Sequence, residues 1–424
     1  MPGSTSFPAR HWSSSPIARV LRPIQEFTER SASGGVVLMA AAVVALILAN
    51  SPLAGPYERL LHVPLGISAG PLRLELSLAH WISDALMVVF FFVVGLEIKR
   101  ELLVGELANL RAALLPIIGA VGGAAVPALI YVAFNAGTPG VAGWGIPMAT
   151  DIAFAIGVLA LLGSRVPFPL VVFVTAVAII DDLIAVLVIA FFYSGGLDFT
   201  ALGLGFAGLA VLVLGNALGI RTILFYLAIG ILVWLAFLQS GVHATIAGVL
   251  VAWTVPARNR IDPDAFLARA GEALDRFRAG RSEATLMLTD EAQQAAVLEL
   301  EAVCENVQAP LQKLEHQLHG WVAFFVMPVF ALANAGVALS LGALAGETSG
   351  VVLGIVLGLV IGKPIGLVGA TWLAVKSGIT QLPGGVRWAH MVGAGALAGI
   401  GFTMSLFVGT LAFGEGELLE AAKV

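Results

Sequence analysis

Apolar runs long enough to cross a lipid bilayer follow one another along almost the whole of this 424-residue chain. A membrane helix needs roughly 20 mainly apolar residues, and continuous runs without alternation of apolar and polar residues favour helices over barrel strands. Only 12% of the residues are charged, whereas soluble domains have roughly 25%. The sequence therefore predicts an all-α polytopic membrane protein with about eleven transmembrane helices, at residues 34–50, 78–98, 112–134, 142–163, 168–193, 200–217, 222–238, 242–256, 320–340, 351–375 and 390–413.

The basic residues predict the orientation of these helices, because Lys and Arg concentrate in short cytoplasmic loops. With the N-terminus in the cytoplasm, 18 of the 22 Lys and Arg residues fall on the cytoplasmic side. The first apolar run is followed by a weak cleavage site, and we interpret the run as a helix; a signal peptide is the alternative. The predicted organisation is a cytoplasmic tail (1–33), a first membrane part (34–257), a cytoplasmic helical insertion (258–313), a second membrane part (314–413) and a C-terminal tail (414–424).

Two polar segments differ from the rest of the chain. Residues 57–77 alternate apolar and polar side chains around a Gly/Ser cluster, which predicts a small β-hairpin outside the cytoplasm. Because an isolated hairpin is marginal in water, we expect it to pack against something else, such as a second subunit. The 258–313 segment is rich in Ala, Glu and Arg, which predicts one or two solvated helices. A single cysteine, Cys304, excludes a disulfide framework.

Charged residues occur near the middle of three apolar runs. Asp181 and Asp182 are adjacent in the run 168–193, Asp151 follows Thr150 in 142–163, and Lys363 lies in 351–375. A charge at the centre of a membrane helix costs about 2.5 to 3.5 kcal/mol on insertion scales and usually marks a functional site. Their similar depth predicts that these residues share one site.

Helix-breaking residues occur at the same depth. Pro147 precedes Asp151 by one turn, and Gly399 and Gly401 interrupt the run 390–413. Broken helices are tolerated in a membrane where the exposed backbone is buried in protein or lines a watery cavity. Two such breaks therefore predict a cavity beside the carboxylates, although each break alone could be a packing kink.

The oxygens of Asp151, Asp181, Asp182 and the Thr150 hydroxyl suit both hard cations and protons. Burial and like-charge repulsion favour the neutral form of a carboxyl group, so a proton and a metal ion would compete for the site. Adjacent residues on a regular helix point about 100° apart. We therefore expect one aspartate of the pair to face elsewhere, with Lys363 as its partner; a purely structural ion pair between Asp181 and Lys363 is the alternative.

Five motifs resemble those of the NhaA-type bacterial sodium/proton antiporters. The resemblance extends from about residue 34 to residue 413, apart from the insertion, through ATDIAFA from Ala149, AIIDDL from Ala178, SGVHAT from Ser240, GKP from Gly362 and GIGFTMS from Gly399. It implies an inverted-repeat bundle with two broken helices crossing at mid-membrane. It also implies a pH-regulated, electrogenic secondary transporter of the bacterial inner membrane, which exports Na⁺ or Li⁺ in exchange for H⁺. Such a protein is not an enzyme, uses no cofactor, binds no nucleic acid and forms a homodimer in the lipid bilayer.

The resemblance also implies roles for individual residues. Asp182 would be the principal carboxylate for cation and proton, and Asp181 would either pair with Lys363 or join the ion site. Asp151 would offset the partial positive charge at the N-terminal ends of the broken helices, and Lys363 would offset the partial negative charge at their C-terminal ends. A cytoplasmic pH-sensing cluster would comprise Glu97, Lys99, Arg100, Glu101, Glu315, His316 and His319.

The sequence departs from this family in two places. Its insertion is longer than in the best-known members, and it lacks the twelfth helix with which they end, so we expect a truncated chain or a fold that tolerates the loss. Three other functions remain open at this stage. An intramembrane aspartyl protease would use Asp151 and Asp182 as a shared-proton dyad. A channel would conduct ions faster than the turnover of a transporter allows. A shortened relative of the family could be regulatory or inactive.

Overall fold

The structure is a computed structural model, and it describes residues 33–69, 72–259, 262–279, 290–337, 346, 348–414 and 416–423. Within these residues, eight helices are long and apolar enough to cross a membrane, and two bent pairs of helices raise the number to ten if each pair is one span. The segment predicted at 242–256 corresponds to a shorter apolar helix, Thr245–Thr254. All eleven predicted runs thus contain a helix, which confirms the prediction of a multi-pass helical membrane protein. The predicted tail 1–33 lies, except for Ser33, outside the described residues.

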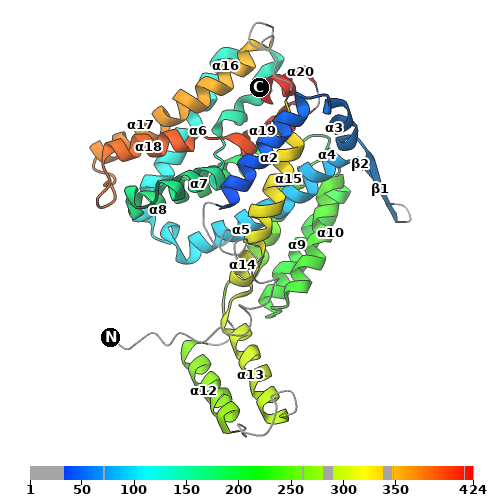
Figure 1. The fold of residues 1–424 in the computed structure, drawn as a ribbon, viewed down its shortest axis with the longest axis vertical. Coiled ribbons are helices and arrows are strands. Elements are labelled where there is room, and N and C mark those ends of the chain that lie inside the picture. The colour runs from blue at the N-terminus through cyan, green and yellow to red at the C-terminus, as the bar shows by residue number, and fades with distance from the viewer. Residues whose placement is uncertain are drawn as a thin grey trace. The chain divides into compact units, whose positions relative to one another are not determined.

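The chain divides into two compact units. One comprises the chain up to Ala79 together with Ala113–Ala185 and Ala323 onward, and the other comprises His80–Ala112 and Val186–Val322. The helices of both are visible in Figure 1. Because the four central charged residues all belong to the first unit, and the predicted pH-sensing residues all belong to the second, each group can be described within its own unit.

The first unit contains the N-terminal helix, the hairpin and both broken helices. Helix α2 packs beside α15 (Figure 1), and α2 and α3 together form a pair bent by 115°. Its elements are α2 (Ser33–Ala49), α3 (Ala54–Leu61), β1 (Pro64–Ala69), β2 (Leu72–Ser77), α6 (Leu110–Asn135), η3 (Pro139–Met148), α7 (Ile152–Leu162), η4 (Gly163–Arg165), most of α8 (Phe168–Phe192), α15 (Met327–Asn334), α16 (Ser349–Leu357), η8 (Gly358–Gly362), α17 (Lys363–Lys376), α18 (Trp388–Ala398), α19 (Phe402–Phe413) and α20 (Glu417–Lys423).

The predicted hairpin is confirmed, but it is shorter than expected. Strands β1 and β2 pair antiparallel, with Pro64 opposite Ser77 and Ala69 opposite Leu72. Tyr57, which the sequence pattern placed in the hairpin region, belongs instead to helix α3, where its hydroxyl donates a hydrogen bond to the carbonyl of Leu332. The alternating pattern predicted extended structure for this segment, but the segment is helical and its tyrosine forms a tertiary contact.

Close glycine contacts bring α6 and α17 together. A Cβ atom at Gly366 would collide with the carbonyl of Gly122, and a Cβ atom at Gly122 would collide with the carbonyl of Gly366. Small residues at such crossings let membrane helices approach closely, where dispersion and not the hydrophobic effect holds them together. This contact fixes α17, and with it the start of that helix at Lys363, against α6.

The second unit is built around α5, α10 and α11, and it carries the insertion. Its buried cluster includes Leu96, Tyr226, Ala252 and Leu314. Asp198 caps α9: its carboxylate accepts hydrogen bonds from the backbone N–H groups of Ala201 and Thr200, which hold its pKa below the ordinary value. The elements are α4 (Leu78–Trp81, shared with the first unit), η1 (Ile82–Leu86), α5 (Met87–Val104), η2 (Glu106–Ala108), α9 (Phe199–Ala217), α10 (Ile223–Ser240), α11 (Thr245–Thr254), α12 (Pro263–Ala279), α13 (Glu291–Val307), α14 (Pro310–Trp321) and η6 (Val322–Val326, which continues into the first unit).

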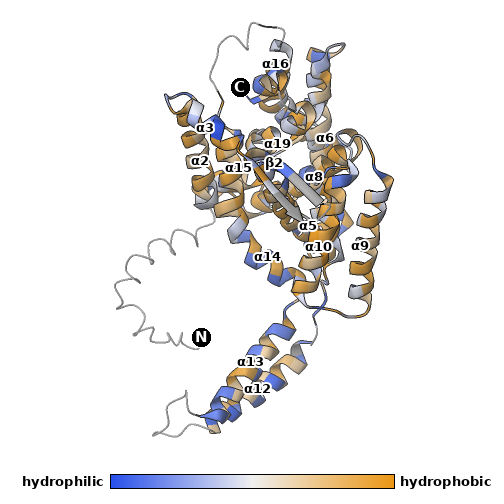
Figure 2. Ribbon diagram, turned by 90° about the vertical axis from the view of Figure 1, so that its right-hand side faces the viewer, coloured by the Kyte–Doolittle hydropathy of each residue, from blue (hydrophilic) through white to orange (hydrophobic). Residues whose placement is uncertain are grey.

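The described part of the insertion contains the helices α12 and α13, which pack against each other. Figure 2 shows that both helices contain many hydrophilic residues, whereas α9 and α10 are mainly hydrophobic. Arg276 on α12 and Glu299 on α13 form an ion pair at 2.6 Å. Helix α14 begins at Pro310, ahead of the predicted domain boundary at 314, because Pro is favourable at the first turn of a helix.

Candidate ion-binding site

The first break lies between η3 and α7. The chain forms a 3₁₀ helix to Met148, is extended at Ala149 and Asp151, and resumes as an α-helix at Ile152. Asp151 is the N-terminal cap of α7, because its Oδ1 accepts a hydrogen bond from the backbone N–H of Phe154 at 2.9 Å. The break falls directly after Pro147, the residue from which the sequence predicted it.

The second break, Gly399–Gly401, separates α18 from α19, which are bent by 44°. A Cβ atom at Gly399 would collide with the carbonyl of Leu359 in η8, so the close approach of η8 requires glycine here. The two breaks touch each other: the backbone N–H of Asp151 donates to the carbonyl of Ile400 at 2.8 Å. The two interrupted helices therefore meet at their breaks.

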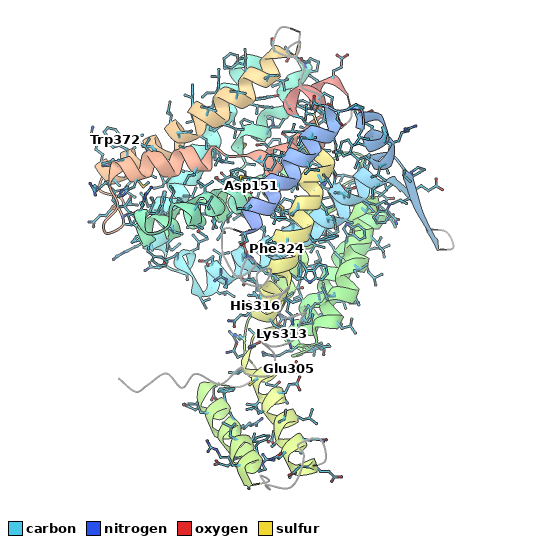
Figure 3. The ribbon with its side chains drawn as sticks, in the orientation of Figure 1. Asp151, Glu305, Lys313, His316, Phe324 and Trp372 are labelled. Atoms are coloured by element: carbon cyan, nitrogen blue, oxygen red, sulfur yellow. The ribbon has the colours of Figure 1, made fainter. Side chains whose placement is uncertain are left out.

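Asp151 receives donors from the start of both continuing helices. Its Oδ1 binds the N-terminal turn of α7 through Phe154, and its Oδ2 accepts the backbone N–H of Thr403 at 3.3 Å and the Thr403 hydroxyl. Figure 3 labels Asp151 at this point. Negative charge is favourable at helix N-termini, where N–H groups lack partners, so one carboxylate serves both α7 and α19. The side chain is only 1% exposed.

Lys363 and Asp181 form a buried ion pair at the carbonyl ends of the same breaks. Lys363 Nζ lies 2.8 Å from Asp181 Oδ2 and also donates to the carbonyl of Met148, the last residue of η3. The Thr150 hydroxyl lies 2.7 Å from Asp181 Oδ2 and 2.9 Å from the carbonyl of Ala398, the last residue of α18. Its one hydrogen serves one of these two acceptors at a time. Thr150 therefore connects Asp181 to the carbonyl end of α18.

Both aspartates of α8 are buried, at 2% exposure for Asp181 and 1% for Asp182. Helix α8 runs without interruption from Phe168 to Phe192, so the two side chains leave it in directions about 100° apart. Asp181 Oδ1 is buried and accepts no hydrogen bond among the described residues. A buried carboxylate oxygen of this kind offers a coordination position for a proton or a hard cation.

The site combines three buried carboxylates with one buried ammonium group, so it is acidic overall. Asp181 is offset by Lys363, and Asp151 is offset by the N-terminal N–H groups of two helices. Ser405 adds a further contact between the broken segments, because its hydroxyl donates to the carbonyl of Ile146 at 3.0 Å. The arrangement holds acidic oxygens beside interrupted backbone, which is a geometry suited to reversible binding of small cations.

Comparison with known proteins gives the family. A sequence profile described as Na⁺/H⁺ antiporter 1 matches residues 25–424. The chain belongs to this antiporter family. It is 51% identical over 409 residues to the Na(+)/H(+) antiporter NhaA of Oleidesulfovibrio alaskensis, covering 96% of this chain and 91% of that protein. The NhaA proteins of an Anaeromyxobacter species and of Acidithiobacillus ferrooxidans are 49% and 48% identical, each over 96% of this chain and over 88% and 93% of the relative. The family resemblance seen in the motifs is thus confirmed.

In this antiporter-family chain, most of the residues predicted for pH sensing lie together in the second unit. Arg100 on α5 forms ion pairs at 3.1 Å with Glu101 and with Glu315 of α14. His319 Nδ1 lies 3.8 Å from Glu97 Oε1. These contacts connect the C-terminal part of α5 with the middle and the last turn of α14 in a charged network.

The two remaining members of that predicted group lie elsewhere. Lys99 turns toward the end of α11, where it donates to the carbonyls of Trp253 and Val255. His316 is exposed on α14 (Figure 3) and forms no ion pair with the described residues. The family resemblance implied the group as a whole and did not distinguish these two residues from their neighbours.

Sequence reasoning assigned no role to Thr403 or Ser405, although both belong to a motif it singled out. Each is a hydroxyl residue just after the glycine break, as Thr150 is just after the proline break. A hydroxyl group beside a broken helix can bind the exposed backbone or a carboxylate. That position relative to the break is the signal that could have identified them.

Proposed function

We propose that the protein exports Na⁺ or Li⁺ across the bacterial inner membrane in exchange for protons. The observation that carries this proposal is the pair of buried aspartates on α8, one of them bound to Lys363, beside two interrupted helices that touch. Membership of the antiporter family supports it, as do the names of the relatives. The proposed activity is transport and not catalysis, and it needs no cofactor.

In this proposal Asp182 is the principal carrier carboxylate. It binds either a proton or the metal ion, because both use the same oxygens and a buried site excludes two positive charges at once. Asp181 has one oxygen bound by Lys363 and Thr150 and the other available. It either remains paired with Lys363 or joins the ion when Lys363 withdraws. Exchange is electrogenic when more protons enter than sodium ions leave.

The network of Glu97, Arg100, Glu101, Glu315 and His319 is the proposed pH-responsive element. Histidine changes charge near neutral pH, and its carboxylate neighbours bind the charged form. We place this network, the N-terminal tail and the insertion 258–313 on the cytoplasmic side, as the distribution of basic residues predicts. We also propose a homodimer, in which the hairpin β1–β2 packs against the second subunit.

The direct test is transport in proteoliposomes that hold the purified protein and a pH-sensitive dye. Addition of Na⁺ or Li⁺ should dissipate an imposed pH gradient, and K⁺ at equal concentration controls for ionic strength. Asp182→Asn should abolish the exchange while leaving the protein folded, because the amide keeps the shape of the side chain and loses its charge. Undiminished exchange by the variant would refute the assignment of Asp182, and no response of the native protein would refute antiport.

A further inference from the structure

The carbonyl end of α11 has an unusually complete set of hydrogen-bond donors. The last carbonyl groups of a helix have no partner within it, and buried ones require donors from elsewhere. Thr254 and Val255 are 6% and 0% exposed, so water reaches this backbone poorly. Six successive carbonyls nevertheless have donors: Val251 from the Thr254 hydroxyl, Ala252 from the N–H of Val255, Trp253 and Val255 from Lys99 Nζ, Thr254 from Asn216 Nδ2, and Pro256 from the N–H of Leu311.

Apart from Thr254 and Val255 themselves, these donors come from three other helices of the second unit. Lys99 belongs to α5, Asn216 to α9 and Leu311 to the first turn of α14. Asn216 lies 2.8 Å from the Thr254 carbonyl, and Leu311 lies 3.1 Å from the Pro256 carbonyl. An ammonium group is favourable at the carbonyl end of a helix, where the helix dipole is negative. The end of α11 is therefore the point at which α5, α9 and α14 are joined.

The same junction closes the base of the insertion. The hydrogen bond between Leu311 and Pro256 brings together the points at which the chain leaves α11 and enters α14. Arg221 also donates to the carbonyl of Arg258, just outside the junction. Beyond it, α12 and α13 pack against each other, and the exposed ion pair of Glu305 with Lys313 links α13 to α14 (Figure 3). Exposed pairs of this kind contribute little stability.

Lys99 and its neighbours on α5 face different partners. Glu97 and Arg100 contact His319 and Glu315 on α14, and Glu101 pairs with Arg100 on α5 itself. Lys99 contacts the two carbonyls of α11 and takes part in none of these ion pairs. Other charged groups beside the junction are Arg221, from the turn between α9 and α10, which donates to the carbonyl of Arg258, and Lys313 on α14, which pairs with Glu305.

We propose that Lys99 is a positioning residue and not a pH-sensing one: with Asn216 it clamps α5 and α9 to the carbonyl end of α11. The part of the insertion that precedes α14, residues 258–309, is an outgrowth that this clamp does not need. Through these two carbonyl contacts, Lys99 then holds Glu97 and Arg100 opposite α14. Removing its donors loosens the junction, whereas removing the insertion leaves the junction intact. The part of this inference that concerns pH rests on the proposed function, and the part that concerns the junction does not.

Hydrogen exchange of the purified full-length protein tests the junction. Lys99→Met keeps the apolar stem and removes the donors, so the amides of Val255 and Leu311 should exchange roughly tenfold faster or more, as expected when a buried carbonyl loses its donor. Asn216→Ala should act in the same direction, and Lys99→Arg should restore protection because guanidinium also donates to two acceptors. Lys376→Met, at the end of α17, is the matched control. Unchanged exchange in Lys99→Met would overturn the clamp.

Two further measurements separate the clamp from the rival roles. If Lys99 titrated, Lys99→Arg would flatten the pH dependence of sodium/proton exchange, because Arg stays charged; the clamp requires the native pH dependence. Replacing residues 260–308 with a short Gly/Ser linker should leave exchange of the two amides and the transport rate within about twofold of native values, as for changes at exposed sites. A larger loss in that variant would show that the insertion holds the junction together. Failure of transport in every protein, with native amide protection, would count against the proposed function alone.

Discussion

Replacement of Lys363 by Met should cost the protein a large part of its stability. Lys363 is 0% exposed and lies 2.8 Å from Asp181, so the variant would leave a carboxylate buried without its cation. Breaking a buried ion pair from one side costs about 3 to 5 kcal/mol, which corresponds to roughly a 10²- to 10⁴-fold change in the unfolding equilibrium. The carbonyl of Met148 also loses a donor.

Thermal unfolding in detergent, followed by tryptophan fluorescence, measures this loss. The decisive comparison is the double variant Lys363→Met with Asp181→Asn, which removes both charges. Because a buried pair is often no more stabilising than neutral side chains of similar volume, the double variant should recover most of the lost stability. Lys376→Met is the control, since the one contact of the Lys376 ammonium group among the described residues is a cation–π contact with Trp372, at 4.5 Å. Such contacts are worth about 0.5 to 1 kcal/mol at exposed sites.

Two results would refute the reasoning about this pair. One is a single variant as stable as the Lys376 control, which would mean that Asp181 is not held as a charged partner of Lys363. The other is a double variant no more stable than the single one. The loss would then come from packing and not from an unpaired charge.

Three more changes test separate contacts. Thr403→Val removes the hydroxyl donor of Asp151 and should cost about 1.5 to 3 kcal/mol in detergent unfolding, whereas Thr403→Ser should remain near native; equal losses would mean that the methyl group matters. Gly366→Ala should cost about 1 to 3 kcal/mol through overpacking against α6, and Gly369→Ala, in open space, should not. At pH values above 3.8, the ordinary pKa of aspartate, Asp198→Ala should unfold at a lower temperature than the native protein. Because the folded pKa is depressed, that difference should vanish as the pH falls through it, and a difference independent of pH would contradict the charged cap.

The membrane helices and both breaks follow from the sequence because they depend on local chemistry. A bilayer requires long apolar runs, and Pro147, Gly399 and Gly401 interrupt hydrogen bonding wherever they occur in a helix. The hairpin 64–77 is local for the same reason. Tyr57–Leu61 was mispredicted because a contact with Leu332, far along the chain, stabilises a different conformation.

The partners of individual side chains depend on how helices are rotated and packed, which a single sequence does not reveal. The sequence placed Lys363 at the depth of two adjacent aspartates, and only the rotation of α8 decides that it meets Asp181. Likewise, the sequence does not show which helix the side chain of Lys99 meets. Its contact with α11 requires that Trp253 and Val255 end their helix beside α5.

Four carbonyl oxygens where the interrupted helices meet already lie beside donors of the protein. Ile146, Met148, Ala398 and Ile400 lie within reach of Ser405, Lys363, Thr150 and the N–H of Asp151, respectively. A sodium ion that takes one of these four oxygens as a ligand must share it with the native donor or displace that donor. Its binding energy and the geometry of the crossing are thermodynamically linked, so an ion that prefers one geometry shifts the population toward it. Loading of the carrier would then favour reorientation without any separate trigger.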